Sequence, residues 1–166
     1  MPGWKHPGIF YIMFVIIMNY SLQDFANLIR ACNGVILYKP LPGEIDYTKN
    51  HFPFQLHTNQ IMLPPDKDED PFAWANKCAD YFKKETPYIL VPGTSFDIYG
   101  TRYGKGDGWY DRFLSKIPHT WLRVGVTFKS RLSNERLLRQ SWDQPVDFVI
   151  SSSNGLYDIF KIKPST

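Results

Sequence analysis

The chain is poor in cysteine, and the two that it has are isolated from each other. Cys32 and Cys78 lie in no Cys-x-x-Cys or Cys/His pattern, so the sequence indicates no metal cluster. Both have apolar neighbours, which is typical of reduced thiols in a protein core. Reduced thiols fit a cytoplasmic location, which we expect for this protein.

Net charge is also small. The sequence contains 19 Lys and Arg residues against 16 Asp and Glu residues, a surplus of +3. That surplus is too weak to predict a nucleic-acid partner. Residues 102–139 differ, because they contain nine basic residues against three acidic ones. This local surplus favours an anionic ligand such as a phosphate, and the alternative is a solvated basic face.

A long hydrophobic run is missing as well. The longest apolar run, residues 9–18, has ten residues, whereas a membrane-spanning helix needs about 20. Only Lys5 precedes it and no small-residue cleavage site follows, so it lacks the features of a signal peptide. It is either a buried strand or, as we slightly favour, upstream sequence before a true start at Met18. We therefore expect residues 1–17 to be an extension that need not be native.

What is present suits one globular domain, residues 18–166. Apolar residues make up 43% of the chain and aromatic residues 16%, which is enough to fill a core. Charged residues at 21% argue against intrinsic disorder. We expect a monomer with no membrane partner.

Strand-like and helix-like segments alternate along the chain. Helical spacing or capping signals predict helices after Ser21, over residues 71–84 with Phe72, Ala75, Ala79 and Phe82 facing inward, over about 108–116, and over 133–139. Apolar runs predict strands over residues 35–38, 60–63, 88–91, 121–128 and 146–150, the last being the final strand. This alternation predicts an α/β fold with a largely parallel sheet.

One glycine-rich segment, residues 102–111, carries the chemistry. Glycines at every second position (Gly104, Gly106 and Gly108) leave the backbone bare, so N–H groups can approach phosphate oxygens. The loop leads into a helix, whose N-terminus favours an anion. The spacing matches neither the Walker nor the Rossmann loop, and on glycine spacing alone a plain structural turn is an equal alternative.

Charged residues surround these glycines. Arg102 and Lys105 can add charge-assisted hydrogen bonds to a phosphate. Asp111 falls in the first turn of the predicted helix, where it could hold Mg²⁺ beside the phosphates. Asp107 is a departure, since a carboxylate repels a triphosphate unless a cation offsets it.

The whole string resembles the 5-formyltetrahydrofolate cyclo-ligase family, also called methenyltetrahydrofolate synthetases. The resemblance continues in the strand at residues 124–128, in Asp143 with Asp147, and in an upstream loop with Glu44. It rests above all on Pro92, Gly93, Phe96, Asp97, Gly100, Arg102, Gly104, Gly106, Gly108, Trp109, Tyr110 and Asp111. It implies a three-layer α/β sandwich of the type shared with ribose-phosphate isomerases and CoA transferases.

The resemblance also implies an activity and a set of roles. ATP would phosphorylate the formyl oxygen of 5-formyltetrahydrofolate, and ring closure would yield 5,10-methenyltetrahydrofolate, ADP and phosphate. Mg²⁺ would accompany ATP, held by Asp111 and Asp143. The resemblance implies catalytic roles for Arg102, Lys105 and Tyr110, ATP binding by Arg102, Gly104, Lys105, Gly106, Asp107, Gly108, Trp109 and Tyr110, and substrate binding by Glu44, Lys105, Gly106, Gly108 and Trp109.

Two questions stay open, each with two alternatives. Trp109 or Tyr110 could stack on the pterin, or each could pack in the core. The family's N-terminal helix with Lys and Arg four residues apart has no match here, since Lys5 and Arg30 are the only basic residues before Lys39. That departure favours a divergent, non-catalytic member that binds a folate or a phosphorylated ligand. Retention of Arg102 and both metal-site carboxylates favours the enzyme.

Overall fold

The computed structural model describes residues 20–49, 52–65 and 68–162. Its centre is a six-stranded sheet in the order β2-β1-β3-β6-β8-β9. All neighbours are parallel except β8 and β9. The strands are β1 (Val35–Tyr38), β2 (Gln60–Leu63), β3 (Tyr88–Pro92), β6 (Leu122–Phe128), β8 (Phe148–Ser153) and β9 (Leu156–Lys161).

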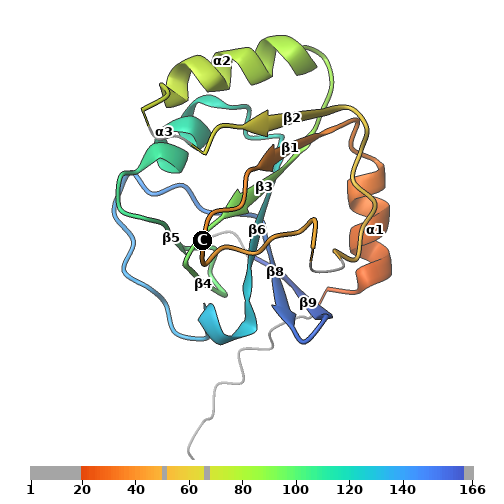
Figure 1. Cartoon of the computed structure of the whole chain (residues 1–166), viewed down its shortest axis with the longest axis vertical. Helices are drawn as coiled ribbons and strands as arrows, with labels where there is room; N and C mark the ends of the chain where they lie inside the picture. The colour runs from red at the N-terminus through yellow and green to blue at the C-terminus, as the bar shows by residue number, and fades with distance from the viewer. Residues whose placement is uncertain (1–19, 50–51, 66–67, 163–166) are drawn as a thin grey trace, which may run out of the picture.

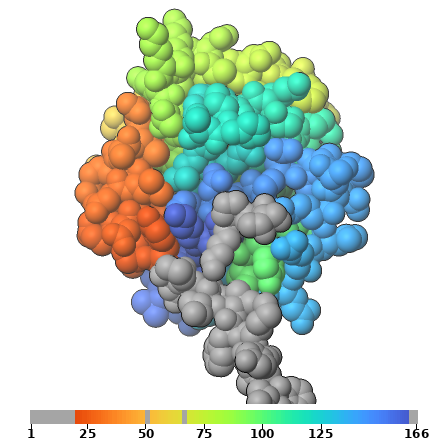
Figure 2. Space-filling model, turned by 180° about the vertical axis from the view of Figure 1, so that it is seen from behind, coloured from red at the N-terminus to blue at the C-terminus, as the bar shows by residue number. Residues whose placement is uncertain are grey.

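Helices cover both faces of this sheet, which gives three layers (Figure 1). Helix α1 (Leu22–Arg30) lies on one face, and α2 (Pro71–Phe82) and α3 (Trp109–Lys116) lie on the other. Seen from behind, α1 forms one flank and α2 crosses the top (Figure 2). The predicted α/β sandwich with a largely parallel sheet is confirmed.

Alternation along β3 shows how the two cores form. Tyr88 and Leu90 pack on the α1 side, whereas Ile89 and Val91 pack on the side of α2 and α3. Successive side chains of a strand point to opposite faces, so a strand covered on both faces is apolar throughout.

A second, three-stranded sheet lies beside the first, in the order β5-β4-β7. It joins β4 (Ser95–Asp97), β5 (Arg102–Tyr103) and β7 (Leu132–Ser133), and a short 3₁₀ turn, η1 (Lys129–Arg131), precedes β7. The small sheet fixes both ends of the segment that leads into the glycine loop.

The predicted helix starts are confirmed by their caps. The Ser21 hydroxyl accepts a hydrogen bond from the Asp24 N–H at 3.0 Å, and the Asp70 carboxylate accepts one from the Phe72 N–H at 2.9 Å. Helix α2 ends at Phe82 rather than residue 84, because Lys83 adopts a positive φ of 37°. Phe72 was wrongly assigned to the inner face, since it is 39% exposed while Cys78 is buried.

Two further predictions were wrong. Residues 133–139 form no helix: Ser133 pairs with Asp97 in the small sheet, and the Leu137 N–H donates to the Asp97 carboxylate at 2.8 Å. Residues 146–150 do not end the sheet, because β8 turns at Asn154 and Gly155 into the antiparallel strand β9. Both residues of that turn have positive φ, as a tight hairpin requires.

In the part of the chain described here, no helix is long and apolar enough to span a membrane. The apolar run at residues 9–18 and the expectation for residues 1–17 fall outside the described residues.

Candidate active site

A cleft of about 920 Å³ opens at the carboxyl ends of β1, β2 and β3. Lys39 follows β1, Pro64 follows β2 and Pro92 ends β3, and all three line the cleft. The chain places β2 on one side of β1 and β3 on the other, so the strand order reverses at this point. Open α/β sheets bind ligands at such a reversal, outside the carboxyl ends of the strands.

Every site residue expected from the sequence lines this one cleft. The residues come from three separate stretches: the loop after β1, the glycine loop with the start of α3, and the loop before β8. They are Glu44, Arg102, Gly104, Lys105, Gly106, Asp107, Gly108, Trp109, Tyr110, Asp111 and Asp143. The fold thus brings together residues that lie up to 99 positions apart in sequence (143 − 44).

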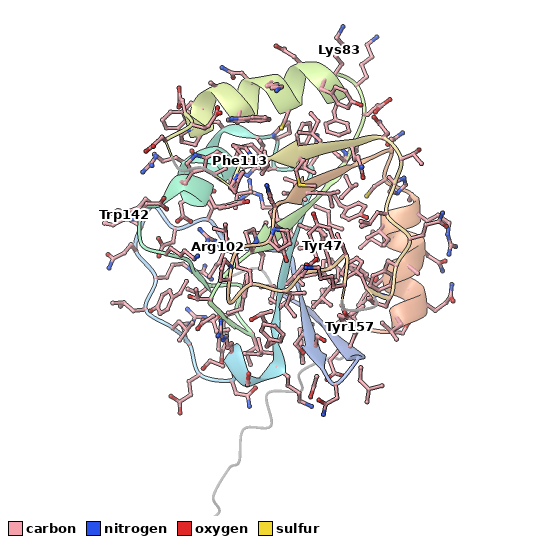
Figure 3. All side chains as sticks on the ribbon, viewed as in Figure 1. Tyr47, Lys83, Arg102, Phe113, Trp142 and Tyr157 are labelled. Atoms are coloured by element: carbon pink, nitrogen blue, oxygen red, sulfur yellow. The ribbon has the colours of Figure 1, made fainter. Side chains whose placement is uncertain are left out.

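Arg102 is the most tightly held cation of the cleft, and it lies near the middle of the molecule (Figure 3). Its Nη2 lies 3.3 Å from Asp111 Oδ2, and its Nη1 donates to the Pro92 carbonyl at 3.3 Å. The guanidinium carbon lies 5.3 Å from the centre of the Tyr110 ring. Its buried Nε has no hydrogen-bond partner among the described residues. An unsatisfied buried donor is costly, so an acceptor atom from a ligand would be favoured there.

The glycines of the loop serve different purposes. A Cβ on Gly104 would lie 2.6 Å from Nη1 of Arg102, so the missing side chain makes room for the guanidinium. A Cβ on Gly106 would meet no atom within 4 Å, so space does not require glycine there. The φ of +90° does, because residues with a side chain rarely adopt it. The sequence indicated bare backbone for a phosphate, and the structure adds these two reasons for glycine.

The N-terminus of α3 favours an anion, and the Asp107 carboxylate already binds there. Gly108, at the N-cap, provides no side-chain cap. Instead Asp107 Oδ1 accepts a hydrogen bond from the Trp109 N–H at 3.2 Å, and Arg112 Nη1 donates to the Asp107 carbonyl at 2.9 Å. The side chain of Asp107 therefore uses one of the helix N–H groups that a phosphate would bind.

Trp109 packs in the core and is unavailable for stacking on a pterin. It is 3% exposed, its Nε1–H donates to the Glu69 carbonyl at 2.7 Å, and its ring stacks on Phe113 at 5.5 Å. Of the two interpretations of this residue, the structure supports core packing.

Tyr110 is half-buried beside Arg102 and Glu44. Burial, with the nearby Glu44 carboxylate, raises the pKa of the Tyr110 hydroxyl, and Arg102 offsets only part of the rise. The phenol therefore stays protonated at neutral pH and can donate a hydrogen bond. Glu44 itself is held by the Leu41 N–H, which donates to Glu44 Oε2 at 2.9 Å.

The basic surplus of residues 102–139 has mixed uses. Arg102, Lys105 and Arg112 line the cleft. Other arginines hold the fold: Arg123 donates to the Leu114 carbonyl at 2.9 Å, and Arg139 donates to the Tyr99 carbonyl at 2.9 Å. The surplus predicted an anionic ligand, but only part of it faces the cleft.

Sequence reasoning missed several lining residues. Lys39 adds a cation, and Leu138 comes from the segment wrongly predicted to be a helix. Gln140, Trp142 and Gln144 come from the loop that follows it. The position of Lys39 directly after a buried strand was the available signal, since strand ends meet at one edge of a parallel sheet.

The carboxylates expected to hold Mg²⁺ are neighbours with different surroundings. Asp111 Oδ2 pairs with Arg102, and Asp111 Oδ1 accepts the Gln144 N–H at 2.9 Å. Asp143 Oδ2 accepts the Gln140 N–H at 2.7 Å. Among residues 20–49, 52–65 and 68–162, no three His, Cys, Asp or Glu side chains are grouped to hold a metal ion. The donor set suits a cation carried mainly by phosphate and water, as Mg²⁺ commonly is.

Known proteins are similar to this chain in sequence and in fold. The model of the 5-formyltetrahydrofolate cyclo-ligase family matches residues 72–152. The 5-formyltetrahydrofolate cyclo-ligase of Mycoplasma pneumoniae is 24% identical over 137 residues, which cover 81% of this chain and 82% of that protein. The enzyme of the same name from Escherichia coli K12 is 36% identical over 66 residues, 39% of this chain and 36% of that one.

Solved structures agree. The 5,10-methenyltetrahydrofolate synthetase of Aquifex aeolicus superposes with a TM-score of 0.55 at 26% identity, covering 88% of this chain and 78% of that chain. The synthetase of Mycoplasma pneumoniae has a TM-score of 0.54 at 18% identity, covering 76% and 79%, and supports the fold. In matched sequence, in fold and in the glycine loop, this chain is similar to the 5-formyltetrahydrofolate cyclo-ligase family.

Proposed function

We propose that this protein converts 5-formyltetrahydrofolate to 5,10-methenyltetrahydrofolate, with ATP giving ADP and phosphate. The observation that carries the proposal is the convergence of the glycine loop, Glu44 and Asp143 in one cleft at the strand-order reversal. Similarity to this family supplies the reaction, and the cleft supplies groups suited to it.

The chemistry assigns a task to each side of the cleft. A formyl oxygen leaves readily only after it is phosphorylated, so the site must hold the γ-phosphate in line and neutralise its charge. Lys105, Arg102 and the loop N–H groups face that charge. Tyr110 would donate a hydrogen bond to the phosphate or the formyl oxygen, since its raised pKa keeps the proton in place.

Mg²⁺ fits this cleft as a companion of ATP. When bound it would neutralise charge on the β- and γ-phosphates. Asp143 uses one carboxylate oxygen for a backbone N–H, which leaves the other oxygen to face a cation. Asp111 would bind Mg²⁺ directly if Arg102 left it to pair with the phosphate. If the ion pair stays, Asp111 would instead hold Arg102 in position.

Lys105 gives the sharpest test. We expect Lys105→Met to lower turnover by about a hundredfold or more, because charge stabilisation by one positioned group contributes on that order. The measurement is the absorbance of the methenyl product with 5-formyltetrahydrofolate and Mg-ATP. Lys129→Met is the matched control, since Lys129 lies outside the cleft and pairs with Asp158 at 3.6 Å. Equal turnover in the two variants would contradict the assignment.

A second candidate is a non-catalytic member that binds a folate or a phosphorylated ligand. The hydrogen bond from Trp109 to Asp107 favours it, because the carboxylate competes with a triphosphate for the start of α3. Heat of binding for 5-formyltetrahydrofolate without product formation from well-folded protein would select this candidate.

We further propose that residues 18–166 form one domain and that the protein acts as a monomer in the cytoplasm, without a nucleic-acid or membrane partner. The free thiols Cys32 and Cys78 and the small net charge support this proposal.

A further inference from the structure

Large apolar side chains collect at the mouth of the cleft. Trp142 is 65% exposed, Leu138 is 72% exposed and Tyr103 is 38% exposed, and all three line the cleft. We call these three residues the apolar rim. Trp142 lies at the margin of the molecule in Figure 3, whereas Arg102 lies inside. Exposed apolar residues that gather at one cleft mark a binding surface more often than scattered ones do.

The apolar rim is fixed to the charged part of the cleft. The Tyr103 hydroxyl donates to the Leu138 carbonyl at 2.9 Å, which joins two of its members. The Gln144 N–H donates to Asp111 at 2.9 Å, and the Gln144 side chain donates to the Trp142 carbonyl at 3.4 Å. The loop that carries Trp142 is therefore tied to the first turn of α3.

Position along the chain relates the apolar rim to the phosphate end of the cleft. Tyr103 directly precedes Gly104, the first glycine of the loop, and Trp142 directly precedes Asp143. The lining of the cleft thus combines cations and glycines of the loop with the exposed side chains of the apolar rim. A ligand that matches both must have a polyanionic end close to a planar ring, as a nucleoside triphosphate does.

We propose that Trp142, supported by Leu138 and Tyr103, stacks on the adenine ring of ATP and provides most of the recognition of the nucleoside. This inference rests on the proposed use of the cleft for a triphosphate. Phosphate contacts alone cannot distinguish ATP from other polyphosphates, because they touch no part of the base. Stacking on a tryptophan supplies that contact and suits any face of a planar heterocycle.

Calorimetry with two probes tests the stacking. Mg-ATP has both the triphosphate and the ring, whereas inorganic tripolyphosphate with Mg²⁺ has only the phosphates. We expect Trp142→Ala to weaken ATP binding about five- to hundredfold, the range for loss of one aromatic stacking contact, and to change tripolyphosphate binding less than twofold. Trp142→Phe should restore most of the affinity, because it keeps an aromatic face. Tyr81→Ala is the control, since Tyr81 is a 53% exposed aromatic residue outside the cleft.

Each other result overturns the inference. An equal loss of affinity for both probes would show that Trp142 has a structural role. Unchanged affinity for both would show that Trp142 does not bind the nucleotide. Loss confined to 5-formyltetrahydrofolate would assign the apolar rim to the other substrate. The outcome is separable from the proposed function: ring-dependent ATP binding without methenyl product keeps the inference and removes the function, whereas full turnover of Trp142→Ala with an unchanged KM for ATP does the reverse.

Discussion

Two loops line the same cleft and differ in what holds them. The glycine loop, residues 102–108, takes its shape from its own residues: Gly106 and Gly108 have positive φ, and Asp107 bonds to Trp109 two positions on. The second loop, residues 134–144, is held by distant groups, since Leu137 bonds to Asp97, Leu138 to Tyr103, and Gln144 to Asp111. The shape of the glycine loop can therefore be predicted from the sequence, whereas that of residues 134–144 cannot.

The difference teaches how such a site is built. Local chemistry can form a phosphate loop wherever a strand leads into a helix, but it cannot close the cleft on the other side. The second loop completes the cleft only when strand β4 and helix α3 are already in place. Damage to the anchors of the second loop should therefore change stability, whereas changes in the glycine loop should act mainly on the ligand.

The strongest test of this comparison is Asp97→Ala. The buried Asp97 carboxylate accepts N–H groups of Tyr99, Thr101 and Leu137, at 2.9, 2.8 and 2.8 Å. Removing it leaves three N–H donors unsatisfied, at about 1–3 kcal/mol each, so we expect a loss of at least about 3 kcal/mol in the free energy of unfolding. Chemical denaturation measures it. Asp24→Ala, which removes an exposed carboxylate of α1, is the control, and a similar small loss in both variants would contradict the comparison.

The next largest effect is expected from Gly104→Ala. The new methyl group would meet Nη1 of Arg102 at 2.6 Å and push the guanidinium from its place beside Asp111. We expect turnover to fall about tenfold or more, since misplaced charges lose transition-state stabilisation, while the free energy of unfolding changes by about 1 kcal/mol or less. Steady-state kinetics and denaturation give the two numbers. Gly155→Ala is the matched control in the β8–β9 hairpin, where a positive φ makes the cost one of stability. Unchanged turnover for Gly104→Ala would show that Arg102 adjusts freely.

The smallest effect concerns Asp107. We expect Asp107→Asn to tighten ATP binding about threefold to tenfold, because it removes one negative charge beside the triphosphate and keeps an acceptor for the Trp109 N–H. The gain should shrink at high salt, since ions screen exposed charges. Calorimetry at two salt concentrations measures this, with Asp24→Asn as the control. Weaker ATP binding in Asp107→Asn would mean that the carboxylate assists the nucleotide.

The sequence by itself determined most of the framework. Apolar runs located β1 and β3, because a strand buried on both faces must be apolar throughout. They also located β6 and the edge strand β2, although β2 is buried only at Leu63. The caps Ser21 and Asp70 located two helix starts, and the glycine spacing located the loop before α3. These features depend on neighbours in sequence, so a reader of the sequence can find them. Asn154-Gly155 is a hairpin signal of the same local kind, since both residues have the positive φ that a tight turn requires.

Only the tertiary structure decided the rest. Residues 133–139 have polar and apolar residues at helical spacing, yet they form no helix, because the buried Asp97 carboxylate accepts the Leu137 N–H and the Tyr103 hydroxyl donates to the Leu138 carbonyl. Trp109 lies in a string that resembles a ligand site, but Phe113 and Glu69 bury it. The apolar rim exists only because two chain segments, residues 102–108 and 134–144, meet at one cleft. Contacts between residues far apart in sequence depend on the completed fold, and that is why no local pattern predicted them.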